Sequence, residues 1–118
     1  MKTILIVEDD VDLSGALYIW LRKKGYNVYQ LQDGGKLLPT LLDMHPDLVI
    51  MDIFLSGYDG RLLVNYLKRT QQFKDIPVLL MSAGNFTNDE IQKFAGEAFI
   101  KKPFILDDLS RKIDEFIH

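Results

Sequence analysis

The stretch Asp47-Leu48-Val49-Ile50-Met51-Asp52 places four apolar residues between two acids. A strand that is apolar at every position is buried on both faces, and such strands belong to parallel sheets covered by helices. The acid at its end, Asp52, needs an explanation, because a neutral residue would be easier to bury there. The stretch therefore indicates an α/β domain, in which ligands bind beyond the carboxyl ends of the strands.

Strand-like and helix-like segments alternate on both sides of this stretch. Short apolar runs predict strands, and apolar residues at helical spacing predict the helices between them. The predicted strands are residues 3–7, 27–31, 47–52, 78–82 and 98–101, and the predicted helices are residues 11–24, 36–44, 60–70, 85–95 and 106–117. Residues 53–59 are predicted to form a loop. Five strands that alternate with five helices predict an open, doubly wound α/β fold with a parallel sheet.

The composition is that of a soluble globular domain. The chain has 118 residues, of which 47% are apolar and 26% charged, and we expect a single domain over residues 1–118. The net charge of −3 argues against nucleic-acid binding by this domain, which depends on clustered Lys and Arg. No apolar run approaches the roughly 20 residues of a membrane helix, and there is no cysteine. A cytoplasmic protein without membrane contact is therefore the expectation.

Polar residues follow four of the predicted strands. Glu8-Asp9-Asp10 follow the first strand, Asp52 ends the third, Ser82 ends the fourth, and Lys102 follows the fifth. A parallel sheet brings these ends to one edge, so we expect one polar pocket there. Neighbouring carboxylates would raise each other's pKa values, and a divalent cation such as Mg²⁺ would relieve their repulsion. Acids, a metal, a hydroxyl and an ammonium group can hold a phosphoryl group, with Asp52 as the nucleophile.

Each of these residues taken alone has an ordinary structural explanation. Asp10 fits the N-cap of the following helix, and Asp59 fits a turn and the N-cap of the helix after it. A phenylalanine in a strand, such as Phe99, usually belongs to the core. His45 and His118 have no partner at metal-ligand spacing and are assigned no role. Only the combination of the acids with the lysine favours a functional site.

The complete pattern, ILIVEDD…DLVIMD…DG…LLMSA…KKPF, resembles the receiver domain of two-component response regulators of the CheY-like kind, over residues 3 to about 117. The resemblance implies a flavodoxin-like sheet with strand order 2-1-3-4-5. It implies a switch that takes a phosphoryl group from a histidine kinase or phosphotransfer protein and turns over no separate substrate. An effector of unknown identity would bind the face formed by residues 85–95, 98–101 and 106–117.

The resemblance also assigns roles in phosphoryl transfer and switching. Asp52 would be the phosphoacceptor, and Lys102 would bind a phosphoryl oxygen. Ser82 would move towards the phosphoryl group, and Phe99 would follow as the aromatic switch residue. The family has a cis peptide bond at the position of Lys102-Pro103.

A metal site is implied by the same resemblance. Mg²⁺, or another divalent cation such as Mn²⁺, would be bound directly by Asp9 and Asp52. Glu8 would act through a water molecule, and the main-chain carbonyl of Phe54 would be a further ligand.

The chain departs from the family pattern near this site. Ser56 stands where the family usually has proline, so we expect a looser loop and a weaker metal site. Residues 95–99 look one residue shorter than the usual connection. Phe54 and Gly84 occupy positions that tune the lifetime of the phosphoryl group, and a bulky Phe54 is expected to shield it from water. Phe99 lacks the hydroxyl of the commoner tyrosine, so switching would occur by burial of the ring.

Two enzyme or cofactor-binding classes fit the sequence less well. A phosphatase of the haloacid dehalogenase type needs a second acid two residues after Asp52, where this chain has Phe54. A flavodoxin needs a first loop that cradles a phosphate, whereas Glu8-Asp9-Asp10 would repel one. A receiver-like interaction module that does not use phosphate stays the alternative, because Ser56 and residues 95–99 depart from the family pattern.

Overall fold

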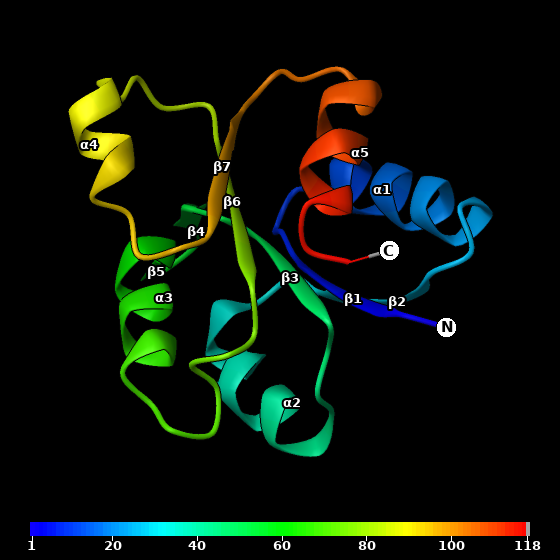
Figure 1. Ribbon diagram of the computed structural model, residues 1–118, viewed down its shortest axis with the longest axis horizontal. Coiled ribbons are helices and arrows are strands. Elements are labelled where there is room, and N and C mark those ends of the chain that lie inside the picture. The colour runs from blue at the N-terminus through cyan, green and yellow to red at the C-terminus, as the bar shows by residue number, and fades with distance from the viewer. Residues whose placement is uncertain (118) are drawn as a thin grey trace.

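One parallel sheet of five strands forms the centre of the molecule (Figure 1). The computed structural model describes residues 1–117, so His118 lies outside the described residues. The strands are β1 (Thr3–Val7), β2 (Asn27–Leu31), β3 (Leu48–Asp52), β6 (Val78–Ser82) and β7 (Ala98–Lys101), and they lie in the order β2-β1-β3-β6-β7. The predicted fold and the predicted order 2-1-3-4-5 of these strands are therefore confirmed.

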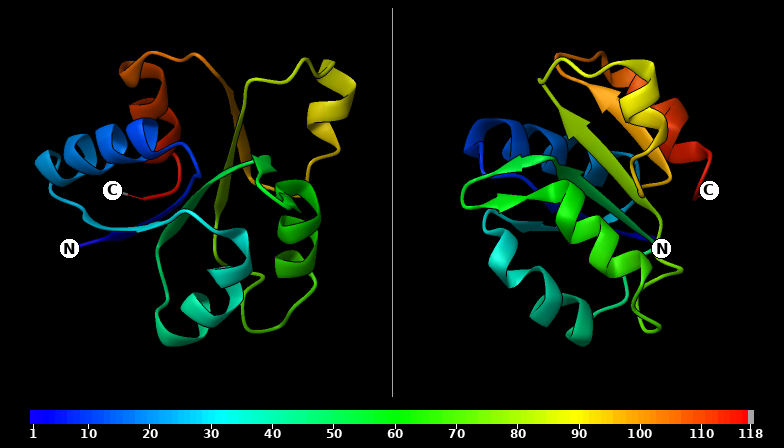
Figure 2. Two further views of the ribbon diagram at one scale, coloured as in Figure 1. Left: turned by 180° about the vertical axis from the view of Figure 1, so that it is seen from behind. Right: turned by 90° about the vertical axis from the view of Figure 1, so that its left-hand side faces the viewer.

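Helices cover both faces of the sheet (Figures 1 and 2). One face carries α1 (Val11–Lys23) and α5 (Leu106–Asp114), and the other carries α2 (Leu37–Asp43) and α3 (Gly60–Lys68). Alternate residues of β1 point to the two sides: Ile4 and Ile6 belong to the first core, and Leu5 and Val7 to the second. This alternation explains why the central strands β1, β3 and β6 are apolar at nearly every position. Among residues 1–117, no helix is long and apolar enough to cross a membrane.

The structure differs from the prediction after β3. Residues 53–59 contain a two-stranded antiparallel hairpin of β4 (Phe54–Leu55) and β5 (Tyr58–Asp59) instead of a plain loop. Gly57 lies between these strands with a φ of 79°, a conformation that glycine adopts without steric cost. Strands of two residues are too short to show a hydrophobic period, so the sequence pattern could not reveal them.

Other helical segments also differ from the prediction. The helix α4 covers only Asn88–Gln92, and its start is set by a capping box between Thr87 and Glu90. A short 3₁₀ helix, η1 (Gly34–Lys36), precedes α2. The helix α5 ends at Asp114, earlier than the predicted residue 117.

The connection into β7 is anchored by Glu97. Its carboxylate accepts a hydrogen bond of 2.6 Å from the main-chain N–H of Val78 and forms an ion pair with Lys68. Lys68 also donates to the main-chain carbonyl of Ile76 at 2.7 Å. These contacts tie the end of α3 to the beginnings of β6 and β7.

Asp59 caps α3 as predicted and pairs with Arg61. The carboxylate accepts the Arg61 N–H at 2.9 Å and two guanidinium hydrogen bonds at 3.1 and 2.8 Å. The Arg61 side-chain hydrogen bond lowers the pKa of Asp59 below its ordinary value of 3.8. A lowered pKa in the folded state means that this stabilisation is complete above pH 3.8 and is lost as the pH falls through the folded-state pKa.

Asp59→Ala is therefore expected to lower the free energy of unfolding by about 0.5–2 kcal/mol at neutral pH. Asp59→Asn should lose less, since asparagine also caps helices. Urea unfolding at neutral pH and near pH 3 would measure both, and the difference between wild type and Asp59→Ala should shrink in acid. A deficit of the same size at both pH values would contradict the assigned role of the charge.

Candidate functional site

Three carboxylates meet at the carboxyl ends of β1 and β3, where the strand order reverses. Oxygen atoms of Glu8, Asp9 and Asp52 lie within 4.8 Å of one another. Glu8 is fully buried, Asp52 is 6% exposed, and Asp9 is partly exposed. The main-chain N–H of Glu8 donates to the carbonyl of Leu31 at 2.9 Å, which continues the pairing of β1 with β2 and fixes the start of the acidic run.

Lys102 supplies the positive charge of this site from beyond β7. Its Nζ forms ion pairs with Glu8 and with Asp52, the latter at 2.8 Å. Burial lowers the pKa of Lys102, but the hydrogen bonds to Asp52 and Glu8 outweigh it and raise the pKa above its ordinary value. Burial raises the pKa of Glu8, the hydrogen bond from Lys102 opposes this, and the net pKa is raised. Lys102 is therefore the cation that allows two buried acids to lie side by side.

Asp9 is held by the loop that was predicted to be loose. The main-chain N–H of Ser56 donates to Oδ2 of Asp9 at 2.9 Å, and Ser56 lies between β4 and β5 of the hairpin. A proline at this position would have no N–H to donate. The serine therefore adds a hydrogen bond between this loop and the acidic cluster, and the expected looser loop and weaker metal site stay predictions.

The other predicted site residues have different surroundings. Ser82 ends β6, is fully buried, and its Oγ accepts the Gly84 N–H at 3.0 Å. The Phe54 N–H donates to Oδ1 of Asp52 at 3.0 Å, which places this residue beside the acids, while the role of its carbonyl stays a prediction. Phe99 does not join the acids and packs in an aromatic cluster, 6.2 Å from Phe86 between ring centroids.

The local structure around the site agrees with two further expectations. Asp10 caps α1, and its side chain accepts the N–H groups of Asp12 and Leu13. The peptide bond between Lys102 and Pro103 is cis.

Two contributors were not found from the sequence. The first is the main-chain N–H of Ser56. Every residue except proline has this donor, and only the fold brings it to Asp9. Phe86, in the loop after β6, stacks on Phe54, and an isolated phenylalanine in a loop carries no periodic signal. The glycine at position 84 was the available hint, because a glycine next to a functional strand end can mark a close approach.

The three carboxylates fit a hard divalent cation. Mg²⁺ and related ions prefer oxygen ligands, and they take one or two carboxylates together with water and phosphoryl oxygens. Glu8, Asp9 and Asp52 offer such oxygens within the 4.8 Å separation given above. The cluster could therefore hold Mg²⁺ or a similar ion.

Comparison with known proteins identifies the family. Residues 4–114 match the family model of the response regulator receiver domain. The chain is 34% identical over 115 residues to the DNA-binding dual master transcriptional regulator RpaA of Synechocystis sp., covering 96% of this chain and 48% of RpaA. It is 30% identical over 105 residues to the phosphate regulon transcriptional regulatory protein PhoB of Pseudomonas aeruginosa, covering 87% of this chain and 46% of PhoB. The chain thus spans about half the length of these curated relatives.

Solved structures agree with this result. The response regulator TrrA of Thermotoga maritima, solved in complex with Mg²⁺ and BeF, is 26% identical with a TM-score of 0.88, over 99% of this chain and 100% of that one. The receiver domain of a signal transduction histidine kinase from Syntrophus aciditrophicus is 27% identical with a TM-score of 0.91, over 99% and 90% of the two chains. The chain belongs to the family of response regulator receiver domains.

Proposed function

We propose that this domain is a phosphorylation-operated switch of a two-component system and that Asp52 accepts the phosphoryl group. The observation that carries the proposal is the surroundings of the Asp52 carboxylate. One carboxylate oxygen accepts a hydrogen bond from the Phe54 N–H, and the other accepts one from Lys102 Nζ. The carboxylates of Glu8 and Asp9 lie beside this group. A carboxylate held in this way is oriented for attack on phosphorus and is accompanied by the charges that phosphoryl transfer requires.

The proposed reaction moves a phosphoryl group from a phosphohistidine of a histidine kinase or phosphotransfer protein. A P–O bond forms to Asp52 while the P–N bond breaks, and the released imidazole nitrogen takes a proton from solvent. Lys102 would hold a phosphoryl oxygen. A divalent cation bound by Glu8, Asp9, Asp52 and the Phe54 carbonyl would supply further positive charge. In a separate hydrolysis step water attacks phosphorus, the P–O bond to Asp52 breaks, and inorganic phosphate leaves, so that the carboxylate is regenerated without a separate substrate.

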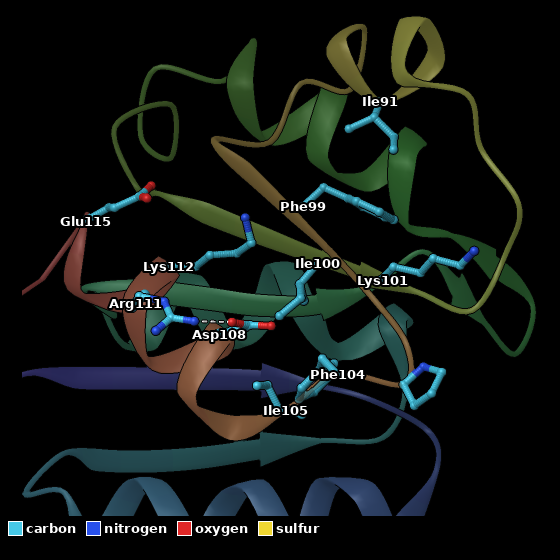
Figure 3. A pocket seen from close by; sticks show the side chains of 11 residues that line it. Ile91, Phe99, Ile100, Lys101, Phe104, Ile105, Asp108, Arg111, Lys112 and Glu115 are labelled. Carbon is cyan, nitrogen blue, oxygen red and sulfur yellow. Dashed lines mark hydrogen bonds and ion pairs between the residues drawn. The ribbon is translucent and has the colours of Figure 1, made fainter.

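Phosphorylation would change the surface on which an effector binds. It adds nearly two negative charges beside Ser82 and Lys102. The main-chain N–H of Lys102 donates to the carbonyl of Ser82 at 2.8 Å, and Ser82 pairs with Lys101 of β7. A hollow of about 750 Å³ lies between α4, β7 and α5. Its lining includes Phe99, Ile91 and the ion pair of Arg111 and Asp108 (Figure 3). We place the effector at this surface, because a change in the position of the Phe99 side chain would alter its shape.

Intact-mass spectrometry after incubation with Mg²⁺ and acetyl phosphate tests the proposal. One added phosphoryl group that EDTA prevents is the expected result. A folded protein that takes up no phosphoryl group would refute the proposal and favour the alternative, a receiver-like module that binds its partner without phosphate.

The hydrogen bond from Ser56 to Asp9 predicts an effect on metal affinity. Outer partners that orient a ligating carboxylate commonly contribute tenfold or more to metal affinity. Ser56 has a negative φ and follows an extended residue, Leu55 of β4, so proline fits the backbone. Ser56→Pro should therefore weaken Mg²⁺ or Mn²⁺ binding by about tenfold, measured by calorimetric titration without phosphodonor. Ser56→Ala keeps the N–H and should bind like the parent, and equal affinity of all three would rule out this role.

The ring of Phe54 predicts slow hydrolysis of the phosphoryl group. The residue adjoins Asp52 through the 3.0 Å hydrogen bond of its N–H, and an apolar ring beside a reactive acyl phosphate hinders the approach of water. Phe54→Asn should shorten the phosphoryl lifetime several-fold, measured by mass spectrometry after removal of the phosphodonor. An unchanged lifetime would show that the ring does not shield the site.

A further inference from the structure

Two phenylalanine rings meet over Gly84 at the mouth of the site. The rings of Phe54 and Phe86 are stacked, with centroids 6.0 Å apart and an interplanar angle of 18°. A Cβ at Gly84 would lie 2.8 Å from a ring carbon of Phe54 and 2.9 Å from one of Phe86. Such distances are below ordinary contact, so a side chain at this position would require one of the two rings to shift. We call Phe54, Gly84 and Phe86 the aromatic clamp.

The clamp connects the two strand ends that flank the phosphoacceptor position. The main-chain N–H of Phe54 donates a hydrogen bond of 3.0 Å to Oδ1 of Asp52. The main-chain N–H of Gly84 donates one of 3.0 Å to Oγ of Ser82. The Phe54 ring therefore reaches from the end of β3 to the loop after β6. A ring in this position would obstruct water that approaches Asp52 from between these two strand ends.

Phe86 is the fixed partner of the pair. Its ring makes edge contacts with Phe94 and Phe99, with centroids 5.2 and 6.2 Å away. The guanidinium carbon of Arg61 lies 5.6 Å from the ring centroid. Side chains from three further parts of the chain thus surround Phe86, and it is partly buried.

Phe54 depends on this partner because its own surroundings are open. It is 53% exposed and belongs to a strand of two residues at a hairpin. An exposed aromatic ring loses rotamer freedom when it is ordered, and a stacking partner offsets this loss.

We propose that Phe86 is a positioning residue for the hydrolysis step: it holds the Phe54 ring across the mouth of the site and so limits the access of water to the phosphoryl group on Asp52. The role of Phe86 in hydrolysis rests on the proposed function, because it requires a phosphoryl group on Asp52. The restraint of the Phe54 ring by Phe86 rests on the geometry alone. In the hydrolysis that it slows, water attacks phosphorus, the P–O bond to the carboxylate breaks, and the products are inorganic phosphate and free Asp52.

The lifetime of the phosphoryl group tests the functional part. An aromatic pair contributes an energy equivalent to about two- to tenfold in a rate, so Phe86→Ala should shorten the lifetime by about that factor. Phe86→Tyr keeps an aromatic ring stacked on Phe54, so its phosphoryl lifetime should be close to that of the parent protein. Phe94→Ala is the matched control, since it removes a ring of the same cluster that is not stacked on Phe54. It takes away only one edge contact of Phe86, so it should shorten the lifetime less than Phe86→Ala does.

A double-mutant cycle separates positioning from general loosening. If Phe86 acts through Phe54, the double variant of Phe54→Ala with Phe86→Ala should hydrolyse no faster than Phe54→Ala alone. The inference would be overturned if the double variant hydrolysed faster than Phe54→Ala by the same factor that Phe86→Ala shows alone. It would also be overturned if Phe94→Ala shortened the lifetime as much as Phe86→Ala. Thermal unfolding of each variant establishes that the compared proteins are folded.

Fluorescence quenching tests the held ring without any phosphoryl group. In a Trp20→Phe background, Phe54→Trp places the single indole at the mouth of the site, and acrylamide reports how freely that side chain moves into solvent. Adding Phe86→Ala should increase the quenching, and no increase would overturn the clamp. If the unchanged protein takes up no phosphoryl group, the proposed function and the lifetime role fail together, and the quenching result then decides on the held ring alone.

Discussion

Asp52→Asn is expected to abolish phosphoryl uptake from acetyl phosphate in the presence of Mg²⁺. An amide oxygen is too weak a nucleophile to form the acyl phosphate, although its size and shape match those of the carboxylate. The asparagine oxygen can still accept the Phe54 N–H, which donates to Oδ1 in the parent protein. Lys102 keeps its ion pair with Glu8, so the site retains a compensating charge. The loss of uptake would therefore report the missing nucleophile rather than a collapsed site.

The comparison needs a control with the same chemical change at a neighbouring acid. Asp10→Asn provides it, because Asp10 caps α1 and asparagine is an equally good N-cap. This variant should take up one phosphoryl group at nearly the parental rate, as followed by intact mass. Peptide mapping of the phosphorylated parent should place the group on Asp52. Uptake by Asp52→Asn, or a phosphoryl group on Asp9 in the parent, would assign the acceptor elsewhere.

The fold was predictable because its signal lies within single segments. Every residue of β3 and of β6 is buried, so each strand had to be apolar throughout, and the acid or hydroxyl that ends it is conspicuous. The meeting of Asp52 with Glu8 and Lys102 follows from the geometry of a parallel sheet, in which the carboxyl ends of the strands share one edge. Strand ends are thus the part of a site that residue order alone can place.

The remaining features depend on contacts that no local pattern encodes. The hairpin after β3 needs the positive φ of Gly57 and only two residues in each strand. The Ser56 donor is a main-chain group, and its acceptor Asp9 lies 47 residues away in the sequence. Phe86 gains its meaning from stacking on Phe54, which only the packed loops bring into range. Long-range contacts of this kind decide how the site is tuned.

Lys102→Met is expected to reduce stability strongly, because it leaves buried acids without a cation. Glu8 is fully buried and Asp52 is nearly so, and both lose the ammonium group that they share. Removing one partner of a buried ion pair typically costs about 3–5 kcal/mol. The matched control is Lys101→Met, since Lys101 is exposed and its Nζ donates a hydrogen bond of 3.3 Å to the Asn85 side chain. The stability of this variant should stay near that of the parent.

The pH dependence of this deficit follows from the direction of the Glu8 pKa. Burial raises that pKa above the ordinary 4.5, and Lys102 opposes the rise, so removing the lysine should raise it further. A folded state with the higher pKa binds the proton more tightly, and folding is therefore favoured as the pH falls towards 4.5. In urea unfolding with EDTA, the deficit of Lys102→Met should be smaller at pH ~5 than at pH ~7. A deficit that is equal at both pH values would mean that the lysine stabilises the fold by packing rather than by its charge on the acidic cluster.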